Sequence, residues 1–264
     1  GTAFGAKVVP VRVLGRGGGY DSDIADAVIW ASGGSVSGVP ANANPAEVIN
    51  LSLGGSGACG TTTQNAINSA VSRGTTVVVA AGNSNTNVSS AVPANCPNVV
   101  AVAATTSAGS RASFSNYGTG IDISAPGQSI LSTLNTGTTT PGSASYASYN
   151  GTSMAAPHVA GVVALMQSVA PSPLSPAQVE SIIKSTARPL PGACSGGCGA
   201  GIIDANALVA LAGGSNPPPP PPPPPTGGTL TKGVAVTNLS ASTGNSLYYT
   251  LSVPSGASNL TFNL

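Results

Sequence analysis

The apolar residues of the first two hundred positions follow two alternating patterns. One pattern is a short, continuous apolar run bounded by Gly, Asn, Asp or Ser, which is typical of a buried strand. Four such runs occupy residues 48–53, 75–81, 99–104 and 121–125. A fifth run, residues 7–14, is rich in Val, and its Pro10 predicts an edge strand or a bulge.

The second pattern places apolar residues three and four positions apart, as in a helix that buries one face. It predicts five helices, at residues 21–31, 61–73, 152–169, 175–186 and 204–212. Asp21 or Ser22 is the expected cap of the first helix, Ser175 opens a capping box, and Asp204 caps the last helix. Because buried strands alternate with helices, the predicted class is α/β, with a mostly parallel sheet covered by helices on both faces.

Nine consecutive prolines, residues 217–225, divide the chain. Such a run adopts an extended polyproline helix and acts as a stiff spacer, although it also suits proline-recognising domains. We therefore expect a first domain over residues 1–213, a Pro/Gly linker over residues 214–228 and a β domain over residues 229–264. The last segment alternates apolar and polar residues, as strands do, but is too short to stand alone and predicts an incomplete β-sandwich.

The composition excludes several classes of function. Only 6% of the residues are charged and the net charge is +1, so the chain offers no basic face to a nucleic acid. No apolar stretch reaches the roughly 18 residues that a membrane span requires. With 41% hydrophobic residues in well-formed runs, the chain is expected to be a folded, soluble monomer.

The four cysteines favour a secreted protein with two disulfides over a cytosolic protein with free thiols. Three pairings are possible in principle. The glycines between Cys194 and Cys198 permit a tight loop to close, and this pairing leaves Cys59 to bond with Cys96. The cysteines form no convincing zinc set with the single histidine, His158, so no metal site is predicted.

Ser153 stands at the predicted start of the long helix, in the segment Asn150-Gly-Thr-Ser-Met-Ala-Ala-Pro-His158. The free N–H groups and the dipole of a helix N-terminus stabilise negative charge that develops near the hydroxyl. On these residues alone, Ser153 is either a nucleophile or an ordinary serine cap. His158 is no base for it, because five residues along a helix turn the ring about 140° away.

Asn83 follows Gly82 at the carboxyl end of the strand predicted at residues 75–81. Sheets of α/β proteins bind ligands at this edge, and an asparagine amide at such a place can donate to an oxyanion. Taken alone, Asn83 is better explained as a turn residue. Only when Ser153 and Asn83 are considered together do they indicate a functional site.

The segment at residues 150–161 resembles the serine motif of the subtilisin-like serine proteases, or subtilases, nearly residue for residue. Ala80-Ala-Gly-Asn83 resembles their oxyanion-hole motif, and residues 48–55 resemble the strand whose end forms a wall of the specificity pocket. Residues 114–118 and 125–127 also fit the family. The similarity covers nearly everything before the proline run, and it implies a subtilisin-like fold and a secreted serine endopeptidase.

The resemblance implies roles for individual residues. Ser153 is expected to be the nucleophile, and Asn83 and the backbone N–H of Ser153 are the expected donors to the oxyanion. The pocket for the residue before the scissile bond is expected to be lined by Ser52, Leu53, Gly54, Ala80, Ala81 and Gly82.

The resemblance also implies a protein or peptide substrate in extended conformation. Gly17, Gly18 and Gly19 resemble the edge segment that pairs with its backbone. No cofactor is required for the chemistry, and calcium is expected only as a stabilising ion without assignable ligands. The last residues, 229–264, resemble the start of a bacterial pre-peptidase C-terminal domain.

The chain departs from the family in one respect. Subtilases carry the catalytic Asp and His before the region that resembles residues 1–14, and no histidine precedes Ser153 here. His158 and Asp122 resemble structural residues of the family. We therefore expect the complete protein to be a protease and this chain alone to be inactive and unstable. The alternative is a non-catalytic subtilase fold that binds extended peptides.

Overall fold

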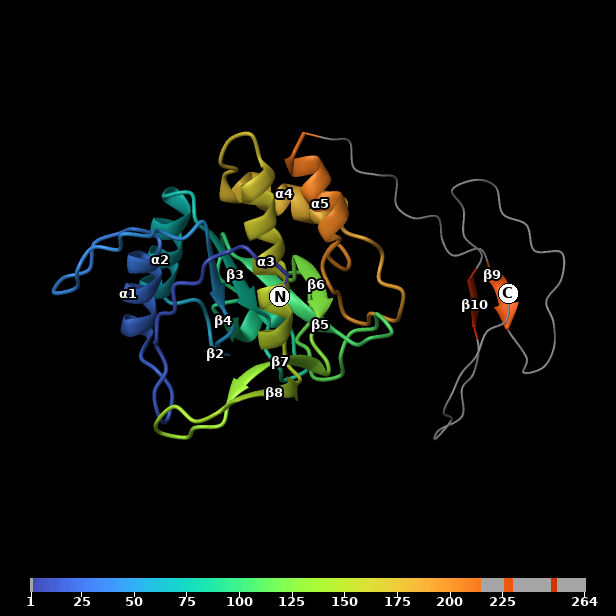
Figure 1. Ribbon diagram of the computed structural model, residues 1–264, viewed down its shortest axis with the longest axis horizontal. Coiled ribbons are helices and arrows are strands. Elements are labelled where there is room, and N and C mark those ends of the chain that lie inside the picture. Colours follow the sequence, from blue (N-terminus) through green and yellow to red (C-terminus); the bar gives the residue numbers. More distant parts are fainter. Residues whose placement is uncertain (1, 215–225, 230–247, 251–264) are drawn as a thin grey trace. The chain divides into compact units, whose positions relative to one another are not determined.

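The computed structural model describes residues 2–214, 226–229 and 248–250 (Figure 1). The chain divides into two units, Gly1–Pro217 and Pro218–Leu264. In the second unit, strand β9 (Thr226–Thr229) pairs in parallel with strand β10 (Tyr248–Thr250). Strand β9 includes the last positions of the predicted linker. The proline run and most of the predicted β domain lie outside the described residues.

A four-stranded parallel sheet forms the centre of the first unit. Its order is β1 (Val48–Leu51), β3 (Thr76–Ala80), β5 (Val100–Thr105) and β6 (Ile123–Pro126). Every residue of β3 and β5 is buried, because these strands are covered on both faces. Burial on both faces explains why these strands are continuous apolar runs in the sequence. The predicted α/β class is confirmed.

Helices cover both faces of this sheet (Figure 1). Helices α1 (Asp21–Ala31) and α2 (Thr61–Ser72) pack on the face that receives Val77 and Val79. On the opposite face, which receives Val78, three helices share one core: α3 (Thr152–Val169), α4 (Pro176–Thr186) and α5 (Ala205–Ala212). The alternation of Val77, Val78 and Val79 follows from the two-residue period of a strand.

The predicted caps form at two of three helices. Ser175 makes the capping box of α4 with Gln178, and Asp204 accepts a hydrogen bond from Ala207 N–H at the start of α5. The cap predicted for α1 is wrong, because the N-cap residue is Tyr20 and its side chain makes no capping bond. Asp21 lies instead in the first turn, where the helix dipole favours its charge.

The strand predicted at residues 7–14 does not form, and this segment is irregular and largely exposed. Val8, for example, is 83% exposed. Strand β1 pairs with β3 along one edge, and no strand pairs with its other edge within the described part of the chain. An extended run keeps its conformation only if a neighbouring strand accepts its backbone hydrogen bonds.

Two small antiparallel sheets accompany the central sheet. Strand β7 (Ile130–Asn135) pairs with β8 (Ala144–Tyr149) to form a hairpin that leads into α3. Strand β2 (Gly55–Ser56) pairs with β4 (Ala91–Val92) beside the main sheet. These strands lack the continuous apolar runs by which the central strands were recognised.

Both expected disulfides are present. The Cys59–Cys96 bond ties the residue before the N-cap of α2 to the segment that precedes β5, across a sequence separation of 37 residues. The Cys194–Cys198 bond closes a short loop near α5. Among the residues that the structure describes, no helix is long and apolar enough to cross a membrane.

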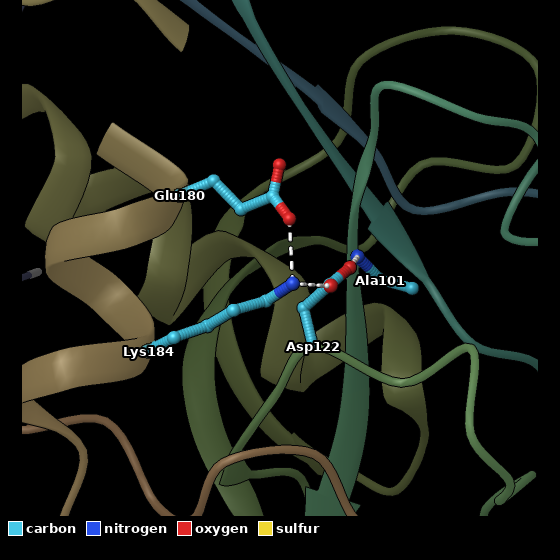
Figure 2. A network of polar contacts seen from close by, with 4 residues as sticks. All are labelled: Ala101, Asp122, Glu180 and Lys184. Carbon is cyan, nitrogen blue, oxygen red and sulfur yellow. Dashed lines mark hydrogen bonds and ion pairs between the residues drawn. The ribbon is translucent and has the colours of Figure 1, made fainter. Parts of the chain in front are cut away.

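A partly buried carboxylate, Asp122, joins helix α4 to the amino ends of β5 and β6 (Figure 2). It accepts a hydrogen bond of 2.7 Å from Ala101 N–H and lies 2.7 Å from the Lys184 ammonium, which also contacts Glu180. Burial raises the pKa of Asp122, because the loss of solvation outweighs these favourable contacts. Burial acts to lower the pKa of Lys184, but its bonds to Asp122 and Glu180 raise it overall.

Candidate active site

The candidate site lies at the carboxyl edge of the sheet, opposite the Asp122 network. Asn83 follows strand β3, and Ser153 lies in the first turn of helix α3, whose N-cap is Gly151. The sequence separates Asn83 from Ser153 by 70 positions, but strand β3 and helix α3 pack together in one core and bring them to the same place.

Thr152 determines which way the Asn83 amide points. The Asn83 Oδ1 atom accepts hydrogen bonds from the Thr152 N–H, at 2.8 Å, and from the Thr152 hydroxyl, at 2.9 Å. The same hydroxyl accepts a bond of 3.0 Å from Gly82 N–H. Because an amide oxygen must face these donors, the Nδ2 donor of Asn83 is turned to the other side.

That side faces the start of helix α3. A Cβ atom built on Gly151 would lie 3.6 Å from Asn83 Nδ2 and 3.6 Å from the Ser153 nitrogen. The two nitrogens therefore border the same small space beside Gly151. The Ser153 N–H lies in the first turn, where helical geometry provides no backbone acceptor. Two donors that converge on one space can hold an oxyanion.

Ser52 holds the backbone of Ser153. The Ser52 hydroxyl donates a hydrogen bond of 2.8 Å to the Ser153 carbonyl and accepts one of 2.9 Å from Asn50 Nδ2. In return, the Ser153 hydroxyl donates a long bond of 3.3 Å to the Ser52 carbonyl. These contacts join the end of β1 to the start of α3 and place the Ser153 hydroxyl at the sheet edge.

A pocket of about 530 Å³ opens beside Ser153. Five of the six residues predicted to line it do so: Leu53, Gly54, Ala80, Ala81 and Gly82. Ser52 does not line the pocket and instead makes the bonds described above. The opposite wall comes from β2 and β4, and no charged side chain lines the pocket. Its surface suits an uncharged side chain.

Sequence comparison assigns the family. Residues 1–201 match the subtilase family. The chain belongs to this family. It is 73% identical over 261 residues to an extracellular protease of Xanthomonas campestris pv. campestris, a match that covers 99% of this chain and 44% of that protein. It is 50% identical over 212 residues to an extracellular basic protease of Dichelobacter nodosus, with coverage of 79% and 35%.

Solved subtilase structures have the same fold. A protease of Pseudoalteromonas arctica PAMC 21717 superposes with a TM-score of 0.78 at 58% identity, over 80% of this chain and 65% of that one. A cold-adapted subtilisin-like serine proteinase superposes with a TM-score of 0.61 at 34% identity, over 75% of this chain and 67% of that one. The chain spans less than half the length of the two curated relatives above.

Asn116 is a site residue of this subtilase chain that the sequence alone did not reveal. Its side chain is buried, and its Oδ1 accepts bonds of 3.1 Å from the N–H groups of Ser84 and Thr86, while its Nδ2 donates to the Ala81 carbonyl at 2.8 Å. Asn116 thus holds the loop that carries Asn83. Its position in a segment typical of subtilases was the available signal, but only the fold shows these contacts.

The predicted substrate edge, Gly17 to Gly19, forms a tight turn. The Gly18 N–H and carbonyl bond to the carbonyl and N–H of Gly15, at 3.3 and 2.8 Å. Gly17 and Gly18 have φ values of +95° and +116°, which favour glycine. The N–H and carbonyl of Gly18 are therefore used within the turn.

The described residues hold neither a base for Ser153 nor an evident metal site. His158 bonds through Nδ1 to the Met154 carbonyl of its own helix, at 2.8 Å, which is the structural role expected from the sequence. No three His, Cys, Asp or Glu side chains gather closely enough among these residues to hold a metal ion.

Proposed function

We propose that this chain is part of a secreted serine endopeptidase that cleaves extracellular proteins through an acyl-enzyme. Ser153 attacks the peptide carbonyl, and Asn83 Nδ2 and the Ser153 N–H stabilise the oxyanion. The observation that carries the proposal is the double acceptance at Asn83 Oδ1, which directs Nδ2 to the side of the Ser153 N–H.

The neutral pocket supports a preference for a substrate with an uncharged, apolar residue before the scissile bond. Leu53 and Ala80 to Gly82 provide small or apolar walls, and a charged side chain would lose solvation there without gaining a partner. In this proposal the substrate runs in extended conformation, with Gly17 to Gly19 as one edge.

Efficient attack by Ser153 requires a general base, since a serine hydroxyl is a weak nucleophile at neutral pH. His158 cannot serve, because its ring is bonded through Nδ1 to the Met154 carbonyl of its own helix and lies five residues beyond Ser153, which turns it about 140° away from the serine. We propose that a histidine and its carboxylate partner elsewhere in the complete protein supply this function. The extracellular proteases related to this chain extend well beyond the matched part, and the two disulfides suit secretion.

A serine-directed fluorophosphonate tests the proposal on the complete protein. We expect stoichiometric labelling and cleavage of a chromogenic peptide, with both lost in Ser153→Ala. In subtilisin, loss of the oxyanion asparagine lowers kcat by about 10²–10³-fold, and we expect the same range for Asn83→Ala. Complete protein that folds but is neither labelled nor active would refute the proposal and favour the peptide-binding alternative.

A further inference from the structure

Most residues of the hairpin of β7 and β8 are exposed. Six of its twelve strand positions place side chains on one exposed face, because residues two apart share a face and paired strands align. Leu131 and Tyr146 lie diagonally on this face and are 68% and 72% exposed. We call this surface, which also includes Thr133 and Ser148, the hairpin face.

Side-chain and backbone hydrogen bonds hold the tip of the hairpin. At its tip, Asn135 Oδ1 accepts bonds from Gly137 N–H, at 2.9 Å, and Gly142 N–H, at 2.7 Å, while Asn135 Nδ2 donates to the Gly142 carbonyl. Thr136 and Ser143 exchange a further backbone and side-chain pair. A preorganised structure loses less conformational entropy when it binds a partner.

The base of the hairpin is tied to the turn that carries Ser153. Asn150 Oδ1 accepts a bond of 2.7 Å from Ser129 N–H, and Gly151 N–H donates one of 2.8 Å to the Gly127 carbonyl. Strand β8 then continues into helix α3 through these two residues (Figure 1). At about 3.3 Å per strand residue, Tyr146 lies on the order of 10 Å beyond Tyr149, at the base of the hairpin.

The chemistry of the hairpin face restricts what it can bind. Residues 123–151 contain no Asp, Glu, Lys, Arg or His, so the hairpin attracts neither a nucleic acid nor a charged segment. Within the described parts of the chain, neither β7 nor β8 pairs with a third strand, which leaves backbone donors and acceptors at both outer edges. An open edge beside exposed apolar side chains suits an extended, uncharged polypeptide.

We infer that the hairpin face is a second docking surface for protein substrates, and that it binds an apolar, extended stretch beyond the residue held in the pocket. None of the hairpin residues lines that pocket, so the two surfaces are separate. The inference rests on the proposed protease function. Its consequence is a preference for long polypeptides over short peptides, because only a long chain reaches both surfaces.

The test uses the complete protein, the double variant Leu131→Ser/Tyr146→Ser and the control Val169→Ser. Val169 is 40% exposed at the far end of helix α3 from Ser153. We measure kcat/KM for two substrates, oxidised insulin B chain and a peptide p-nitroanilide, and take the ratio of the first value to the second. The anilide has no residues beyond the scissile bond. We expect the double variant to lower this ratio roughly tenfold and the control to leave it unchanged.

Binding measured without cleavage separates this inference from the proposed function. In a Ser153→Ala background, the hairpin variant should weaken the Kd for B chain roughly tenfold, as judged by calorimetry. If wild type cleaves nothing but this difference persists, the protease function fails and the docking surface stands. An unchanged ratio and an unchanged Kd would overturn the inference, as would equal losses on both substrates. A dimer that only the hairpin variant dissociates, with an unchanged ratio, would assign the face to a second copy and also overturn it.

Discussion

Replacing Asp122 distinguishes its hydrogen-bonding role from its charge. In Asp122→Ala, the N–H of buried Ala101 loses its 2.7 Å acceptor, and a buried unsatisfied donor costs about 1–3 kcal/mol. Loss of the contact to Lys184, whose side chain is 42% exposed, adds no more than about 1 kcal/mol after solvent screening. We therefore expect the free energy of unfolding to fall by about 1–4 kcal/mol.

Asp122→Asn keeps an oxygen for the Ala101 N–H and removes only the charge. Since burial raises the pKa of Asp122, the carboxylate is already disfavoured by the fold, and its loss should change stability by less than about 1 kcal/mol. A raised pKa means that the folded state binds the proton more tightly than the unfolded state. The stability that this residue contributes is therefore fully present below its unfolded pKa of 3.8 and is lost as the pH rises through the folded pKa.

Urea unfolding of the complete protein, followed by far-ultraviolet circular dichroism, measures these differences. With rising pH through the raised pKa, the stability of wild type should fall relative to Asp122→Asn. If Asp122→Asn is as destabilising as Asp122→Ala, the charge rather than the acceptor stabilises the fold, and the reasoning above is wrong. If both variants match wild type, the network contributes nothing measurable.

Three further predictions concern the site and the disulfide. Thr152→Val should lower kcat about tenfold and the free energy of unfolding by about 1–3 kcal/mol, because Asn83 loses one of its two orienting bonds and Gly82 N–H loses its acceptor. Thr152→Ser keeps the hydroxyl and serves as the control. If Thr152→Val and Thr152→Ser had the same kcat, the assignment would be contradicted. Ser52→Ala should lower kcat roughly fivefold with little change in KM, as measured with a peptide anilide, since Ser52 does not line the pocket. A rise in KM alone would point to a role in binding. Replacing Cys59 and Cys96 together by Ser should lower the free energy of unfolding by about 3–4 kcal/mol in urea, given the 37-residue separation, whereas a loss below about 1 kcal/mol would show that the loop is constrained without the bond.

The sequence by itself determined the α/β class, the central strands and most helix boundaries. These features follow from local causes: buried strands of a parallel sheet are apolar at every position, and helix caps such as Ser175 act within one turn of the chain. Ser153 and Asn83 were also singled out as candidates, because each belongs to a segment that resembles a subtilase motif. Residues 7–14 show the limit, since their apolar pattern is that of a strand and yet no neighbour pairs with them here.

Only the tertiary structure decided how the site works. Sequence spacing says nothing about Thr152 turning the amide of Asn83, about Asn116 holding the loop beside it, or about Ser52 bonding to a residue 101 positions away. The sequence pattern likewise did not predict the exposed face of the hairpin that leads into helix α3. A hydrogen bond between distant segments depends on the packing of strands and helices that carry them, and that packing is a property of the whole fold.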